Sequence, residues 1–179
     1  MIEVRRLAAS LACALLLLAG GCATTPEPRA PSDLSGRLAL RVDAPEAARS
    51  FSADFDLRGD AARGNLRLTG PLGAMLAQAR WQPGAAELTT SDNAVRVFDD
   101  LDQLAQALLG ESLPMAALID WLRGRPWSGA ASVAAGDGFD QLGWTIDLAR
   151  YAEGVLSATR AAQRGQAAVI VRVRLDRAS

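Results

Sequence analysis

The sequence lacks histidine altogether and has only two cysteines and one tyrosine in 179 residues. Without histidine, Ser-His-Asp and Cys-His catalysis, histidine metal ligation and histidine-based pH switching are excluded. Cys13 lies in a segment that we expect to be removed, so Cys22 has no partner for a disulfide, a zinc cluster or a redox pair. Because these residues are absent, we do not expect the protein to be an enzyme or a metalloprotein.

The sequence also has almost no excess of either positive or negative charge. The formal net charge is −1, and every basic residue is an arginine. A nucleic-acid-binding surface or a polybasic membrane patch needs a basic excess that this composition does not supply. We therefore expect no nucleic-acid partner and no cofactor.

The first 22 residues have the composition of a secretory signal. Arg5 and Arg6 precede an apolar run over residues 7–19, and small residues lead into Cys22. The run is short for a membrane-spanning helix. A cysteine directly after small residues resembles a bacterial lipoprotein signal, so we expect residues 1–21 to be removed and Cys22 to carry lipid. An ordinary cleavable signal followed by a chance cysteine is the alternative.

Residues 22–33 contain three prolines and no large apolar residue, which is typical of a flexible tether. From residue 34 onward the sequence predicts one domain, 34–179, that begins with alternating apolar and polar residues. The alternation covers 37–42, 51–58 and 65–69, and predicts half-buried strands joined by short turns. Such neighbours form an antiparallel meander, because parallel strands need long crossovers.

The pattern changes period near residue 99. Further strands are predicted at 75–82, 85–91 and 94–98, and two helices then follow between residues 99 and 124. Alternation returns at 143–149 and 167–175, giving nine to eleven strands in all. The two helices are the only elements that can cover the apolar face of the sheet. The fold class is therefore mainly β with an α lid: a curved antiparallel sheet forms a half-open β-barrel that short helices close.

The interior of this half-barrel has two interpretations. Small barrels usually fill their interiors with side chains. The aromatic content is only 5%, and several inward positions are alanines (Ala53, Ala77 and Ala79), which favours a ligand cavity. The residues alone leave both possibilities open.

One turn carries an apolar residue at its tip. The strand over residues 66–69 ends in Gly70-Pro71-Leu72-Gly73, and Leu72 has no large neighbour to cover it. A single exposed leucine is not in itself evidence of a function. Leu72 therefore either folds back onto the sheet or is exposed in order to contact a partner.

Several segments in order resemble the LolB family of outer-membrane lipoprotein receptors, over residues 34–176. These are Gly36-Arg37-Leu38, residues 66–69 with Pro71-Leu72-Gly73, Gln82-Pro83-Gly84, Leu113-Pro114 with residues 121–124, Gly143-Trp144 with Ile146 and Tyr151, and the final strand. The resemblance implies a LolA/LolB-like half-barrel whose cavity receives acyl chains of lipoproteins delivered by a LolA-type periplasmic carrier. It implies a monomer, lipid-anchored at Cys22 on the periplasmic face of the bacterial outer membrane. Ala23 after the cysteine agrees with this location.

The resemblance also implies site residues. The loop Pro71, Leu72 and Gly73 would contact the membrane. The cavity and lid would be lined by apolar side chains, namely Leu38, Leu40, Phe55, Leu66, Leu68, Leu101, Leu104, Leu108, Leu118, Trp121, Trp144 and Ile146. No catalytic residue and no metal ligand is expected.

Alternatives from other classes remain at this point. A structural outer-membrane lipoprotein that scaffolds an envelope complex needs no cavity. A lipid-processing enzyme needs a polarised nucleophile, for which no site is evident without histidine. Arg123 and Arg125 either contact cargo or pair with groups at a helix C-terminus. The acids Asp99, Asp100 and Asp102 either bind calcium or favour a helix N-terminus.

Overall fold

All eleven strands of the described residues pair antiparallel in one continuous sheet. The computed structural model describes residues 33–44, 48–163 and 166–176. The strands are β1 (Leu34–Asp43), β2 (Ala48–Gly59), β3 (Gly64–Thr69), β4 (Met75–Gln82), β5 (Ala85–Thr90), β6 (Val95–Phe98), β7 (Ser132–Ala135), β8 (Gly138–Gln141), β9 (Trp144–Asp147), β10 (Val155–Arg160) and β11 (Ala168–Leu175). Cys22, the expected signal and residues 22–32 of the expected tether lie outside the described residues, so those expectations stay predictions.

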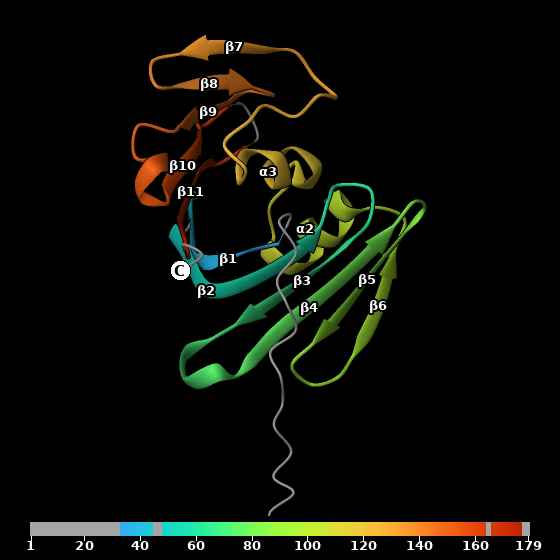
Figure 1. Ribbon diagram of the computed structural model, residues 1–179. Coiled ribbons are helices and arrows are strands. Elements are labelled where there is room, and N and C mark those ends of the chain that lie inside the picture. Colours follow the sequence, from blue (N-terminus) through green and yellow to red (C-terminus); the bar gives the residue numbers. More distant parts are fainter. Residues whose placement is uncertain (1–32, 45–47, 164–165, 177–179) are drawn as a thin grey trace, which may run out of the picture.

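The order of the strands is β6-β5-β4-β3-β2-β1-β11-β10-β9-β8-β7. The first and last strands, β1 and β11, are neighbours at its centre, with Leu38 opposite Val173. The sheet curls strongly but does not close, because β6 and β7 remain its two edges (Figure 1). The predicted half-open barrel is confirmed.

Alternation explains which way the strands face. In β2, Ala53, Phe55 and Leu57 are buried, whereas Asp54 and Ser52 point outward. A side-chain period of two places every second residue on the concave face, where the apolar side chains pack together. The predicted strands at 75–82, 85–91 and 94–98 agree with β4, β5 and β6 to within one residue.

Two α-helices cross the hollow of the sheet. They are α2 (Leu101–Leu109) and α3 (Met115–Trp121), and Figure 1 shows both inside the curve. Asp100 begins α2 by accepting a hydrogen bond from the Gln103 backbone N–H at 2.8 Å, and Gly110 ends it in the left-handed region at φ 72°. Their apolar faces meet the sheet, so the predicted helical lid is confirmed.

Two short 3-10 turns complete the described chain. One, Pro71–Gly73, joins β3 to β4, and the other, Tyr151–Glu153, precedes β10. The β3–β4 hairpin extends away from both helices at the lower left of Figure 1. This arrangement separates the lid from the loop that carries Leu72.

Candidate functional site

A cavity of about 70 Å³ lies between the concave face and the two helices. Every residue that lines it is apolar. Nine of the predicted residues line it: Leu38, Leu40, Phe55, Leu66, Leu68, Leu101, Leu104, Leu108 and Leu118. Strands from the centre of the sheet supply the floor, and the helices supply the roof. The sheet and the lid therefore form one continuous apolar surface, which suits hydrocarbon and excludes an ionic ligand.

The structure does not bring Trp121, Trp144 and Ile146 to this cavity. All three are buried in the other half of the molecule, where the end of α3 meets β8 and β9. The rings of Trp121 and Trp144 lie 5.9 Å apart, centre to centre. Helical and strand spacing correctly predicted that these side chains point inward, but inward positions in the two halves of a curved sheet face different parts of the core.

Several cavity residues were missed. They include Phe51, Trp81, Leu113, Ile119, Val171 and Val173. Phe51, Val171 and Val173 lie on the apolar side of strands whose alternation was evident, so the same signal identifies them. Leu113 lies between the helices, where no periodicity applies. Of the inward alanines, Ala79 lines the cavity, whereas Ala53 and Ala77 are buried elsewhere in the core.

The loop between β3 and β4 presents Leu72 to solvent. Leu72 is fully exposed, with a relative accessibility of 106%, and its backbone adopts φ 63°. The loop is closed by a hydrogen bond of 2.8 Å from the Gly70 N–H to the Ala74 carbonyl. A leucine in the left-handed region is energetically unfavourable, and burial does not compensate it here. The interpretation in which Leu72 folds back onto the sheet is wrong.

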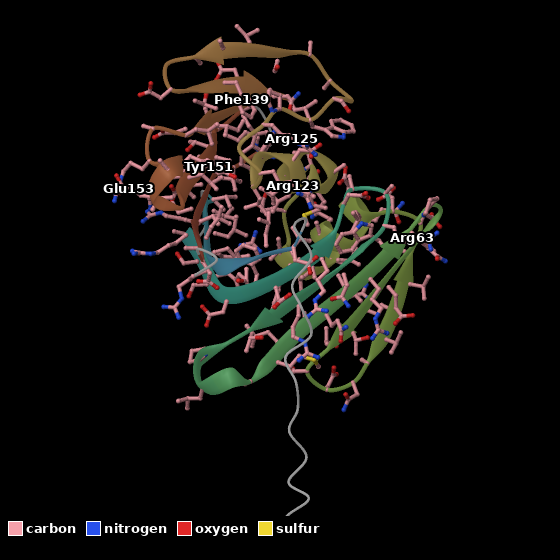
Figure 2. All side chains as sticks on the ribbon, in the orientation of Figure 1. Arg63, Arg123, Arg125, Phe139, Tyr151 and Glu153 are labelled. Carbon is pink, nitrogen blue, oxygen red and sulfur yellow. The ribbon has the colours of Figure 1, made fainter. Side chains whose placement is uncertain are left out.

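Arg123 and Arg125 pair with groups of their own chain. Arg125 contacts the Asp120 carboxylate in α3 at 2.8 Å. Arg123 donates to the Ile119 carbonyl in α3 at 3.5 Å and also to the backbone carbonyl of Gly59. Both lie just after α3, near Tyr151 (Figure 2). The Tyr151 hydroxyl donates to the Leu122 carbonyl at 3.1 Å, and burial raises the pKa of this hydroxyl. These contacts support the helix-end interpretation of the two arginines.

The acidic residues before and within α2 also have structural partners. Asp100 caps α2, and Asp102 accepts a hydrogen bond from the Met115 backbone N–H at 3.0 Å. In the part of the chain that the structure describes, no group of three or more acidic or cysteine side chains is placed to hold a metal. Within the same residues, no helix has the length and apolar character needed to cross a membrane.

Comparison with known proteins agrees with this architecture. A family model described as "Outer membrane lipoprotein LolB" matches residues 32–176. A Bordetella petrii protein named "Outer-membrane lipoprotein LolB" is 36% identical over 156 residues, which cover 79% of this chain and 77% of that protein. Proteins of the same name from Chromobacterium violaceum and Thiobacillus denitrificans are 32% and 35% identical, with 80% and 83% of this chain covered and 83% and 84% of theirs. The chain belongs to the LolB family.

Proposed function

We propose that this protein is an outer-membrane lipoprotein receptor, which accepts the acyl chains of lipoproteins into its cavity and releases them into the outer membrane. The observation that carries the proposal is the wholly apolar cavity between the concave sheet and the helical lid. Family membership supports the same role, since the relatives are named outer-membrane lipoproteins. The work is binding and release, with no covalent step.

The cavity is too small to hold an acyl chain as it stands. A void of about 150 Å³ admits a molecule the size of benzene, whereas the enclosed volume here is about 70 Å³. The lid must therefore move before the cavity can hold an acyl chain. Acyl chains enter when α2 and α3 move outward and expose the lining that these helices share with the sheet.

The hydrophobic effect on the acyl chains supplies the driving force for their transfer. Burial of each methylene group is worth about 0.8 kcal/mol, so an acyl chain avoids water at every step of its transfer. A LolA-type periplasmic carrier presents the acylated lipoprotein, this cavity receives the chains, and the bilayer receives them last. Each site binds the chains more tightly than the one before, so no nucleotide is needed.

Leu72 would bring the receptor to the bilayer. Its side chain is fully exposed on a hairpin that extends away from the lid (Figure 1). Insertion of one leucine into hydrocarbon is worth about 2 kcal/mol, which suits a reversible contact. Pro71 and Gly73 are also exposed and leave this contact unobstructed. The lipid on Cys22 would provide the permanent anchor at the periplasmic face, with the protein acting as a monomer.

A transfer assay tests the proposal. A purified Cys22→Ala form is incubated with a carrier–lipoprotein complex, and the lipoprotein is followed by affinity separation of the two proteins. We expect the lipoprotein to move to the receptor and then to added liposomes. A structural scaffold without ligand transfer would leave all the lipoprotein on the carrier at every ratio, and that result would refute the proposal.

A further inference from the structure

The connector between the two lid helices is held by arginines from two separate strands. Glu111 lies in this connector, two residues after α2. Its Oε1 is 3.4 Å from Nη2 of Arg49 in β2, and its Oε2 is 3.4 Å from Nη2 of Arg160 at the end of β10. Arg160 also donates from Nη1 to the Ser112 carbonyl at 3.1 Å. One carboxylate thus bridges two cations, each on a different strand.

The two arginines that contact Glu111 lie on strands that are not neighbours in the sheet. β2 and β10 are separated by β1 and β11 in the sheet, so Glu111 ties the connector to both sides of the sheet's centre. Leu109 and Leu113, on either side of the connector, line the cavity. Movement of the connector away from the arginines therefore moves cavity lining with it.

Arg160 is poorly suited to a purely structural role. Its side chain is buried, and its guanidinium lies 5.3 Å from the centre of the Trp144 ring. Within the described residues, its Nε is buried without a hydrogen-bond partner. Burial of a charged group with an unmet donor destabilises a fold, and an apolar side chain of similar volume avoids that penalty. An arginine at this position therefore serves more than packing, and its contacts with Glu111 and Ser112 show what it holds.

The opposite end of the helix pair is fixed. Trp121, the last residue of α3, donates from Nε1 to Oε1 of Gln141 at 2.8 Å, and Tyr151 bonds the carbonyl of Leu122. These contacts join the end of α3 to β8 and to the turn before β10. The helix pair is therefore anchored at this end. At the connector it is held by two ion pairs, of which Arg49–Glu111 is open to water and Arg160–Glu111 is largely buried.

We propose that Glu111, held between Arg49 and Arg160, is the clasp that keeps the lid closed and sets how tightly the cavity retains acyl chains. This inference rests on the proposed function. The anchored end of α3 acts as the hinge, and separation of the clasp opens the cavity. An entering acyl chain and the clasp then compete, since the lid does not close fully over a chain larger than the empty cavity.

Hydrogen exchange of the full chain tests the clasp directly. Glu111→Gln keeps the shape of the side chain and removes its charge, and Arg49→Gln removes the more exposed of the two cations. We expect amides of residues 101–121 to exchange about fivefold faster in both variants, while amides of β1 and β2 exchange as in the parent chain. Arg49→Lys keeps the positive charge and should restore most of the protection.

Glu153→Gln is the matched control. It breaks an exposed ion pair with Arg150, at 2.6 Å, in the turn before β10 (Figure 2). Lid exchange should be unchanged in this variant. Unchanged lid exchange in Glu111→Gln would overturn the clasp, and so would an equal increase across the whole sheet, because that result describes general destabilisation.

Palmitate binding separates the clasp from the proposed function. In a Cys22→Ala background, Glu111→Gln should bind palmitate about fivefold faster than the parent, as followed by tryptophan fluorescence. Equal rates in the two proteins would count against the clasp. If the lid opens in Glu111→Gln but palmitate binds neither protein, the clasp is supported and the acyl-chain function fails.

Discussion

The indole Nε1 of Trp121 donates a hydrogen bond of 2.8 Å to Oε1 of Gln141, and both side chains are buried. Gln141 also accepts from the Trp127 N–H at 2.9 Å and donates to the carbonyls of Trp127 and Ala130 at 2.7 and 2.8 Å. One side chain thus joins α3, the segment after it and β8. This pairing fixes the end of the lid to the β7–β10 side of the sheet.

Replacement of Gln141 should destabilise the fold. Gln141→Leu leaves the Trp121 indole and the Trp127 and Ala130 backbone groups without partners in the core. We expect the free energy of unfolding to fall by about 3 kcal/mol, measured by denaturant titration. The control Gln82→Leu changes an exposed glutamine at the end of β4 and should stay within about 0.5 kcal/mol of the parent. A Gln141 effect no larger than that control would contradict the hydrogen-bonded junction.

Leu72 should matter for release and not for folding. Leu72→Glu places a charge where the proposed membrane contact lies, so the protein should accept lipoprotein normally but transfer it poorly to liposomes. Its melting temperature should match that of the parent, because the side chain is fully exposed. The matched control is Leu142→Glu, which alters another exposed leucine with positive φ, in the β8–β9 turn. Equal release from both variants would refute the membrane role of Leu72.

Glycine at the same position separates stability from function. The left-handed backbone of Leu72 costs about 1 kcal/mol relative to glycine, and the greater freedom of glycine in the unfolded chain offsets most of it. Leu72→Gly should therefore change the free energy of unfolding by less than about 1 kcal/mol, in either direction, while release into liposomes falls. A large loss of stability would show that Leu72 supports the fold.

Filling the cavity should block ligand without weakening the fold. Ala79 is buried in β4 and lines the cavity, so Ala79→Leu can occupy part of the 70 Å³. Filling that volume offers up to about 1.7 kcal/mol, and we expect palmitate affinity to fall at least tenfold with stability unchanged or higher. Ala77→Leu is the control, because Ala77 is buried away from the cavity and overpacking there should cost about 2 kcal/mol. Undiminished palmitate binding by Ala79→Leu would place the ligand elsewhere.

The acids at the start of α2 should act without calcium. Asp102→Ala removes the acceptor for the Met115 N–H, and we expect a loss of about 1 kcal/mol in the free energy of unfolding. Asp99→Ala, at an acid outside this contact, should have little effect. Chelation with EDTA should leave the thermal unfolding midpoint of the parent unchanged. A midpoint that falls with EDTA and recovers with Ca²⁺ would revive the metal interpretation.

The early strands and both helices could be located from the sequence because their signals are local. Asp54 and Asp56 alternate with Phe55 and Leu57, and the caps Asp100 and Gly110 bracket α2. β7, β8 and β10 were given no residue ranges. β8 and β10 place Gln141 and Arg160 on their inward sides, which interrupts the alternation, and Val133 of the edge strand β7 is exposed. Their inward polar groups are tolerated only through partners supplied by distant segments.

By itself, the sequence determined the period of the early strands, of β9 and β11 and of both helices, the turn at Gly70–Gly73 and the apolar character of the interior, since these depend on neighbours within a few residues. Tertiary structure alone decided that β1 lies beside β11, that Trp121 bonds Gln141 outside the cavity, and that Glu111 reaches both Arg49 and Arg160. It also decided that Leu72 stands free. The physical reason is the curvature of the sheet, because the curl of eleven strands determines which inward side chains share a cavity and which distant polar groups can meet.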